Sequence, residues 1–286
     1  MEAPDSIWMP FKAKYGLANT HEDIAFNIRS ALKMEFKSLQ EFLGSESGAV
    51  SIVGSGPSLK KNWMKLRDSN TDIIACNAAC QFLLERGIVP KFMFCFDADP
   101  LVLEFFTNPH PEITYLISSR CVPKVFEMLK DHKVVVWHAS GDKDIESILQ
   151  EHGLFTEPMI AGGTAAVTRA MVLGATLGYM TVHLWGADSS FSGKDTHIRK
   201  STTDEKMMSI MMAGKVFEMA PWMTAQCDDF KALAPILKAL GVRLIVHGDG
   251  IIPYLAHTLG YETDLPAYRR ILGKVKTRSQ LFWNAL

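Results

Sequence analysis

Short apolar runs alternate with helical patterns along most of the chain. Seven of these runs are rich in Ile, Val and Phe, and they cover residues 49–53, 72–76, 92–96, 114–117, 133–137, 181–185 and 243–246. Runs that are apolar on both faces are typical of parallel strands buried between two layers of helices. Helical spacing between the runs, as in 78–86 and 163–177, supplies the crossovers that parallel strands need. The pattern predicts an α/β fold with a doubly wound, mainly parallel sheet.

The two ends of the chain carry helical patterns instead. Residues 20–43 read as one helix, with Thr20 as N-cap and apolar side chains at helical spacing up to a Gly- and Ser-rich break at 44–48. The last residues combine apolar positions with a run of basic ones between Arg269 and Arg278, which indicates a docked amphipathic helix with a basic outer face. We therefore expect three parts: an N-terminal helical arm (1–48), a central α/β domain (49–262) and a C-terminal helical tail (263–286).

Composition narrows the class of protein. A hydrophobic fraction of 48% over 286 residues excludes wholesale disorder, and a net charge of −1 gives no global basic field for a nucleic-acid backbone. The sequence contains no run of about 18 apolar residues, so it predicts no membrane-spanning helix. The first residues do not resemble a secretory signal. The five cysteines are scattered without paired CxxC modules, which favours reduced thiols. We expect a cytoplasmic protein, and the sequence leaves open whether it forms a homo-oligomer.

A glycine-rich turn directly after the first predicted strand is the strongest chemical signal. It consists of Gly54, Ser55, Gly56, Pro57 and Ser58. Glycines let the chain turn sharply and bring backbone N–H groups near an anion, and Ser58 can cap the helix that follows. The turn matches neither GxxxxGK[ST] nor the full GxGxxG. It predicts a nucleotide phosphate site, and the alternative is a plain Gly-Pro turn.

The next two predicted strands also end in polar residues. Asn77 can hydrogen-bond a ligand, although capping the following helix is the commoner role for asparagine in this position. Asp97 and Asp99 can hold Mg²⁺ against a diphosphate. Pro100 favours the alternative, in which Asp99 caps a helix and Asp97 is a solvated loop acid. Mg²⁺ is the one cofactor that the sequence suggests.

Later segments add further candidates. Gly162, Gly163 and Thr164 open a small-residue helix and can contact a sugar or phosphate, or serve only close packing on the sheet. Asp188 follows a strand end, where groups that act on ligands collect in open sheets. His197 lies in a charged loop and can act as general acid or base, the alternative being a solvated histidine. The methionines at 207, 208, 211 and 212 have helical spacing and predict core packing.

The order of three motif segments resembles a known family. The segments are VSIVGSGPSLKKN, DIIACNAACQFLLERGIVPKFMFCFDADP and AGGTAAVTRAMVLGATLGYMTVHLWGADSSF. They look like the domain-of-unknown-function-115 family, which includes the motility-accessory-factor proteins and the archaeal 6-hydroxymethylpterin diphosphokinases. The same order is similar to bacterial lipooligosaccharide-type sialyltransferases. The resemblance covers roughly residues 49–250 and implies a Rossmann-like domain that binds a nucleotide through the 54–58 turn and Asn77.

Departures from the family patterns bear on the reaction. The pterin diphosphokinases, which use ATP with Mg²⁺, tend to carry an acid where this chain has Asn77, so the asparagine is closer to the glycosyltransferases. The sialyltransferases place a histidine base before a segment resembling the one that begins at Gln226, and glutamine takes up no proton at neutral pH. The base must then come from His197 or Asp188, and the resemblance to the motility factors around residues 195–197 supports His197.

These observations lead to a function with two alternatives. The first expectation is a transferase that moves a glycosyl group from a nucleotide sugar, CMP-linked in preference, to a hydroxyl acceptor. The alternatives are an ATP-dependent pyrophosphokinase of the 6-hydroxymethylpterin type and a non-catalytic nucleotide-binding or assembly module. The partner is a nucleotide or nucleotide sugar, and the acceptor can be a protein, a glycan or a modified nucleobase.

Overall fold

A parallel sheet forms the centre of the molecule. The computed structural model describes residues 19–193 and 207–265, and all seven predicted strands are present in it. The sheet runs in the order β1-β6-β5-β4-β3-β2-β8-β11-β12, with β7 paired to β6, and every pairing in it is parallel. The strands are β1 (Lys37–Ser38), β2 (Ala49–Val53), β3 (Asp72–Cys76), β4 (Phe92–Cys95), β5 (Thr114–Ser118), β6 (Lys133–Ala139), β7 (Met159–Ile160), β8 (Thr181–Trp185), β11 (Arg243–Val246) and β12 (Glu262–Thr263).

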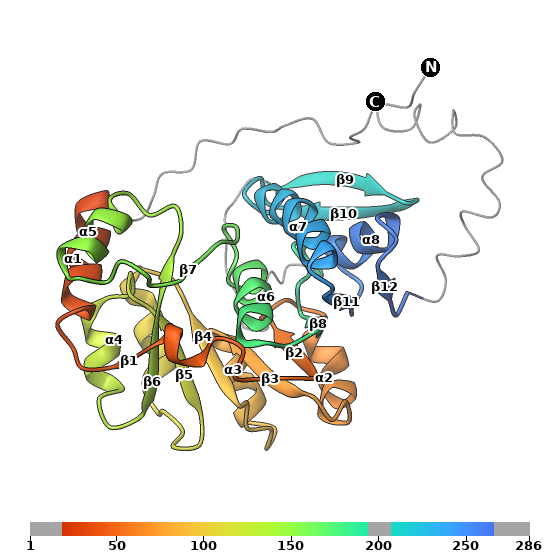
Figure 1. Cartoon of the computed structure of the whole chain (residues 1–286). Coiled ribbons are helices and arrows are strands. Elements are labelled where there is room, and N and C mark those ends of the chain that lie inside the picture. Colours follow the sequence, from red (N-terminus) through yellow and green to blue (C-terminus); the bar gives the residue numbers. More distant parts are fainter. Residues whose placement is uncertain (1–18, 194–206, 266–286) are drawn as a thin grey trace.

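Helices cover both faces of this sheet (Figure 1). One face carries α2 (Leu59–Arg67), α3 (Ala78–Leu84), η2 (Pro100–Phe106) and α4 (Pro123–Met128); the other carries α6 (Ala166–Leu177), α7 (Met223–Ala239) and α8 (Ile251–Thr258). Side chains of β2 alternate between the two cores, with Ile52 on the α6 side and Val53 on the α2 side. The fold is the Rossmann-like doubly wound α/β class that the pattern predicts.

The order of the strands predicts a crevice at the carboxyl ends of two adjacent central strands, β2 and β8. From β2 the chain proceeds through β3, β4 and β5 to β6 on one side, then returns to β8, which lies on the other side of β2. At such a switch point the loops after the two adjacent strands diverge to opposite faces, and ligands bind there in open α/β sheets. The loops after β2 and β8 are therefore the first place to look for a site.

The N-terminal segment differs from the expected single helix. Helix α1 (His21–Ala31) ends well before Leu43, and the chain continues into β1 and the short η1 (Leu39–Phe42). Ser38 and Glu41 form a capping box that starts η1 as a new helix, which separates it from α1. The prediction of one helix over 20–43 is wrong for this reason. The domain boundary at residue 48 stays a prediction, and residues 266–286 of the predicted tail lie outside the described residues.

The methionine-rich stretch is a strand and not a helix. β9 (Met208–Met212) and β10 (Lys215–Met219) pair antiparallel as a hairpin. Ala213 and Gly214, between them, both have positive φ, which is the backbone that two-residue hairpin turns need. The turn residues therefore override the helical spacing of the methionines. Small side chains at both turn positions were the sequence signal for this hairpin.

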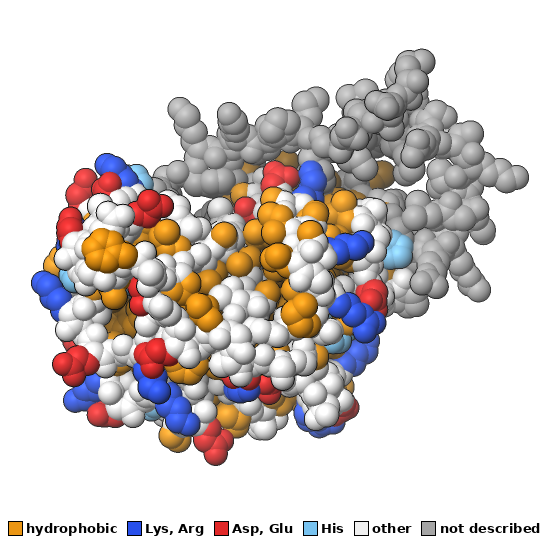
Figure 2. Space-filling model, in the orientation of Figure 1, with side chains coloured by type: hydrophobic (Ala, Val, Ile, Leu, Met, Phe, Trp, Pro, Cys, Tyr) orange, Lys and Arg blue, Asp and Glu red, His pale blue; other side chains and the backbone are white. Residues whose placement is uncertain are grey.

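One face of the molecule carries charges of both signs. On the face drawn in Figure 2, basic and acidic side chains are interspersed, and apolar side chains gather over α7. Helix α7 and its C-cap carry the exposed side chains of Ile236 and Leu240, which are 56% and 67% exposed. Among the described residues, no helix is long and apolar enough to span a bilayer. The five cysteines are buried with free thiols.

Candidate functional site

A pocket of about 250 Å³ opens at the carboxyl ends of β2, β3, β4 and β8. It brings together residues that are far apart in the sequence. From the predicted site residues it contains Gly54, Ser55, Gly56, Asn77, Asp97, Thr164 and Asp188, and it adds Phe96, Ser189, Trp222 and Gln226. The pocket lies at the switch point between β2 and β8, where the topology of the sheet predicts a ligand.

The glycines of the 54–58 turn allow two loops to approach closely. The N–H groups of Gly54 and Gly56 donate to the carbonyl oxygens of Trp185 and Gly186, each at 2.8 Å. A Cβ on Gly56 would lie 2.5 Å from the Gly186 oxygen and 2.4 Å from the Asp188 carboxylate. These glycines thus make room for the loop after β8, and their N–H groups are used inside the protein.

Asp188 takes the position where a phosphate was expected. Its Oδ2 accepts the N–H of Ser58 at 2.7 Å, at the start of α2. The side chain is 4% exposed, and burial raises the pKa of this carboxyl to about 6. A helix N-terminus favours a negative charge, and here the protein supplies that charge itself. Within the turn, Ser55 is the partly exposed residue left to contact a ligand, since Pro57 and Ser58 are buried.

Asn77 has a strained backbone and a side-chain oxygen without a hydrogen-bond partner among the described residues. Its backbone has φ 49° and ψ −125°, and its side chain makes no capping hydrogen bond to α3, so the capping role expected for it is wrong. The backbone N–H bonds to the carbonyl oxygen of Phe94. The side-chain Oδ1 is buried without a hydrogen-bond partner among the described residues. Strain and an unpartnered buried acceptor in a pocket are both typical of a ligand-binding residue.

The carboxylate of Asp229 binds to the loop before α6, much as the carboxylate of Asp188 binds to the turn after β2. The N–H and hydroxyl of Thr164 donate to Oδ2 of Asp229 at 2.6 and 2.9 Å. Gly163 leaves room for this contact, because a Cβ there would lie 1.7 Å from the Asp229 side chain. Gly162 packs against the backbone of Arg169 in α6. Of the three predicted residues, Thr164 is the one that lines the pocket.

The two predicted metal ligands have different surroundings. Asp97 is exposed and lines the pocket, and its Oδ1 accepts the N–H of Asp99. Asp99 caps η2 through its Oδ1, which accepts the N–H of Leu101 at 2.9 Å. Within residues 19–193 and 207–265, no group of three or more His, Cys, Asp or Glu side chains is arranged to hold a metal ion. Of the two acids, Asp97 is thus the one whose side chain lines the pocket.

Gln226 comes from α7 and reaches the loop after β8. Its Oε1 accepts the hydroxyl of Ser189 at 2.6 Å, and Ser189 has a positive φ of 47°. Sequence patterns missed Ser189, which directly follows Asp188 in the loop after β8. They also missed Trp222, because no local pattern shows that α7 packs over the carboxyl ends of these strands. His197 lies outside the described residues.

Comparison with protein families gives one match. The family described as 6-hydroxymethylpterin diphosphokinase MptE-like matches residues 22–194, which is more than half of the chain. A search of curated proteins gives no match.

Comparison with solved structures gives one neighbour of the same fold and two weaker alignments. The MAf glycosyltransferase from Magnetospirillum magneticum AMB-1 aligns with a TM-score of 0.62 and 20% identity over 82% of this chain. This chain spans 38% of that longer protein. The sialyltransferase CstII from Campylobacter jejuni, solved with cytidine-5'-monophosphate, aligns with a TM-score of 0.39 and 19% identity over 69% of this chain and 79% of its own. A mammalian sialyltransferase aligns with a TM-score of 0.40 and 13% identity over 79% of each chain.

Proposed function

The chain belongs to the 6-hydroxymethylpterin diphosphokinase MptE-like family, and from this premise we propose that it is a nucleotide-dependent transferase. The nucleoside binds at the β2–β3 side of the pocket. The observation that carries the proposal is Asn77, whose buried and unpartnered Oδ1 lies at the pocket on a strained backbone. An unpartnered buried acceptor costs about 1–3 kcal/mol, which a ligand N–H group removes when it binds.

The polar groups around Asn77 suit a nucleoside. An asparagine side chain offers one acceptor oxygen and two N–H donors, which can pair with the edge of a base or with a ribose. Ser55 lies in the turn between Gly54 and Gly56 and offers a hydroxyl and an N–H for the phosphate or ribose. Phe96 and Trp222 supply aromatic surface in the same pocket. The N-terminus of α2 takes no phosphate in this proposal, because the Asp188 carboxylate occupies it.

The reaction that we propose is glycosyl transfer from a CMP-linked sugar to a hydroxyl acceptor. The preference for CMP follows the sequence resemblance, in which Asn77 is closer to the glycosyltransferases than to the diphosphokinases. The protein holds the donor in the pocket and orients the acceptor hydroxyl toward it, which lowers the entropy cost of the encounter. His197 is the proposed base that takes the acceptor proton. Asp188 is the weaker candidate for that role, because it is buried and its Oδ2 already accepts the Ser58 N–H.

The family match supports a second candidate, pyrophosphoryl transfer from ATP to a hydroxymethyl group. In that reaction the transferred group is a diphosphate, and Mg²⁺ supplies charge neutralisation for its oxygens. Asp97 would contact the ion, while Asp99 has part of its carboxylate engaged in capping η2. Because Asp97 lines the pocket and Asp99 does not, we place pyrophosphoryl transfer second to glycosyl transfer.

A nucleotide-binding experiment tests the proposal. We expect CMP to raise the melting temperature of the protein, and Asn77→Gly to abolish the shift. Glycine tolerates the positive φ at this position, so the variant removes the amide without adding strain. Asn70→Gly is the matched control: Asn70 also has a positive φ, of 50°, but lies in the turn before β3, at the opposite end of that strand.

The outcomes separate the candidates. A shift with CMP that Asn77→Gly loses and Asn70→Gly keeps supports the nucleoside role of Asn77. A shift with ATP alone that also requires Mg²⁺ favours pyrophosphoryl transfer over glycosyl transfer. No shift with CMP, CDP, UDP, AMP or ATP would contradict the proposal and favour a non-catalytic module.

A further inference from the structure

Two arginines lie behind the aromatic ring that lines the pocket. Phe96 follows β4, and the guanidinium carbons of Arg120 and Arg169 lie 4.9 and 4.8 Å from its ring centroid. Arg120 follows β5, and Arg169 is in the first turn of α6. The two cations are therefore within about 10 Å of one another, at the same carboxyl edge of the sheet as the pocket.

Buried polar groups around these arginines have unused hydrogen-bonding capacity. Nη1 of Arg169 donates to the carbonyl oxygen of Ile160 at 2.6 Å, but its Nε has no partner among the described residues. Nε of Arg120 is also buried without a partner among the described residues. Asp142 contacts Arg120 through Oδ1 at 3.0 Å, and its own Oδ2 is without a partner.

Carboxylates of the protein offset the charges of this cluster. Asp142, whose side chain is 7% exposed, contacts Arg120, and Asp229 lies near Arg169 and accepts hydrogen bonds from Thr164. Burial raises the pKa of the Asp142 carboxyl. Burial and the charge of Arg120 both lower the pKa of the Arg169 guanidinium. Burying a guanidinium is costly unless its N–H groups are partnered, and the Nε groups of both arginines have no partner among the described residues.

We propose that Arg120 and Arg169 form an oxyanion subsite behind Phe96, at the edge of the pocket, which takes a carboxylate or phosphate group of a substrate. Guanidinium groups bind such oxyanions through paired N–H donors. Arg120 is the binding residue, since its side chain is 17% exposed. Arg169 is more deeply buried and also donates to the Gly163 carbonyl, so it couples the subsite to the loop that carries Thr164. The use of the subsite in transfer rests on the proposed function, whereas its affinity for an oxyanion does not.

Inorganic phosphate is the probe for this subsite. We expect phosphate, titrated against chloride at equal ionic strength, to raise the melting temperature of the full chain in a saturable manner. Arg120→Gln should weaken the apparent affinity about tenfold or more, since it removes a charge-assisted contact. Arg67→Gln is the matched control, because Arg67 also pairs with an aspartate, Asp68, and lies over an aromatic ring, that of Trp63, but is exposed.

A second variant gives a change of opposite sign. Asp142→Asn removes the carboxylate that competes with phosphate for Arg120, so we expect phosphate to bind about threefold to tenfold more tightly, as the loss of an opposing charge near a cation implies. This variant is expected to be less stable without phosphate, because a buried cation loses its partner. Misfolding cannot imitate tighter binding, so the pair of variants remains decisive where one of them folds poorly.

The outcomes are distinct from those of the nucleotide experiment. Phosphate binding that Arg120→Gln loses and Asn77→Gly keeps supports the subsite, whether or not any nucleotide binds. If Arg120→Gln also weakens the binding of CMP but not that of cytidine, the oxyanion at the subsite is the phosphate of the nucleotide. If CMP and cytidine both bind to this variant unchanged, the oxyanion belongs to the second substrate. Stabilisation by phosphate that is equal in Arg120→Gln and in the original chain, or that Asp142→Asn does not increase, overturns the proposal.

Discussion

At the residue scale, Asp188 is the pocket residue that brings several loops together. Its carboxylate accepts the Ser58 N–H, and the absence of a Cβ on Gly56 and Gly250 makes room for it. It therefore joins the loops after β2, β8 and β11. Asp188 thus connects the loops around the pocket, and the proton transfer that its sequence position suggested stays a prediction.

Asp188 gives stability a pH dependence of unusual sign. Burial raises its pKa from 3.8 to about 6, so between these pH values the folded protein holds a proton that the unfolded chain has lost. The free energy of unfolding due to this group is then highest below pH 4 and falls as pH rises through 6, by about 2–3 kcal/mol at roughly 1.4 kcal/mol per pKa unit. The variant Asp188→Asn has no carboxyl group at this position, so its free energy of unfolding does not fall in this way as pH rises. We expect its stability relative to the original chain to rise by that amount between pH 4 and pH 7, measured as urea midpoints.

The comparison within each pH removes the contributions of all other titrating groups, since both proteins share them. If the stability of Asp188→Asn minus that of the original chain stays constant from pH 4 to pH 7, or falls as pH rises, Asp188 is not a desolvated carboxyl in the folded protein.

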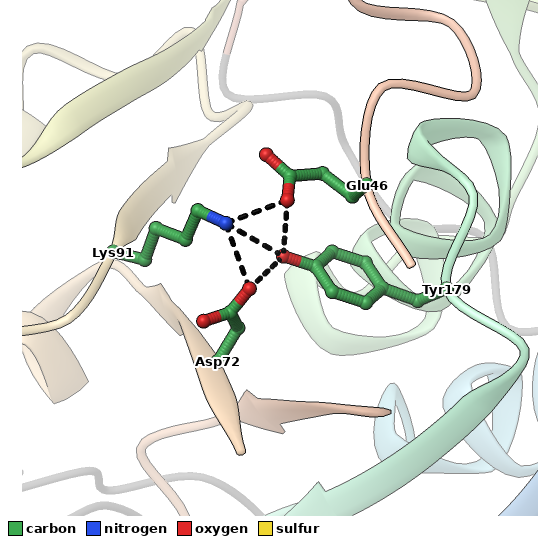
Figure 3. Close-up of polar contacts among 4 residues, drawn as sticks. All are labelled: Glu46, Asp72, Lys91 and Tyr179. Carbon is green, nitrogen blue, oxygen red and sulfur yellow. Dashed lines mark hydrogen bonds and ion pairs between the residues drawn. The ribbon is translucent and has the colours of Figure 1, made fainter. Parts of the chain in front are cut away.

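At the scale of elements, a polar network connects the amino ends of the central strands, at the end of the sheet opposite the pocket. Figure 3 shows the Lys91 ammonium between the carboxylates of Glu46 and Asp72, with Nζ–O distances of 2.6 and 2.7 Å. The hydroxyl of Tyr179 donates to Asp72 at 2.5 Å. These four residues stand at or just before the starts of β2, β3, β4 and β8. The network joins the amino ends of the same four strands whose carboxyl ends form the pocket.

Lys91 is the one cation in this network. Burial raises the pKa of the Asp72 carboxyl, but the hydrogen bonds from Lys91 and Tyr179 outweigh this and hold it below its usual range. Lys91→Met leaves Glu46 and Asp72 facing each other without a cation. We expect a loss of about 1–2 kcal/mol in the free energy of unfolding, discounted for the partial exposure of the lysine.

Lys124→Met is the control for that substitution, because Lys124 pairs with Glu127 at 2.8 Å on an exposed helix surface. Its loss should be under about 0.5 kcal/mol. Equal losses for the two lysines in chemical denaturation would mean that the network contributes no more than a surface ion pair.

At the scale of the whole molecule, the described part of residues 1–48 is packed against the sheet. β1 pairs with β6, and Leu39 is fully buried in the core that contains β2, β6 and α6. Ile28 of α1 is equally buried, together with Ile148 of α5 (Ile145–Glu151). These contacts lead us to expect that this segment unfolds together with the domain.

Leu39→Ala tests this expectation. It leaves a cavity in the shared core, so the single unfolding transition should lose about 2–5 kcal/mol. Leu43→Ala, at a side chain that is 46% exposed, should change little. Near-ultraviolet circular dichroism follows the core through the buried Trp137. An unchanged transition for Leu39→Ala would favour residues 1–48 as a separate arm.

Much of the fold was predictable from the sequence, because its signals are local. Buried parallel strands need side chains that are apolar on both faces, and each of the seven runs shows this within four or five residues. The turns were also marked, since glycine is needed where two loops approach as closely as those at Gly56 and Gly186. The segments that escaped prediction are short. β1, β7 and β12 have two residues each, and such strands exist only because a neighbour offers its free edge.

The chemistry of the pocket was decided by tertiary structure. The sequence identified Ser58 and Thr164 as polar residues at helix starts and Asp188 as one at a strand end. It did not show that the Asp188 carboxylate accepts the Ser58 N–H or that the Asp229 carboxylate accepts the Thr164 N–H. Which hydrogen bonds stay open to a ligand depends on partners more than 60 residues away along the chain. Asn77 shows the same point from the other side: its residue type suggests a helix cap, whereas the fold gives it a strained backbone and leaves its Oδ1 unpartnered. Local patterns determine the elements and the edge at which they end, and long-range packing determines which polar atoms there remain available.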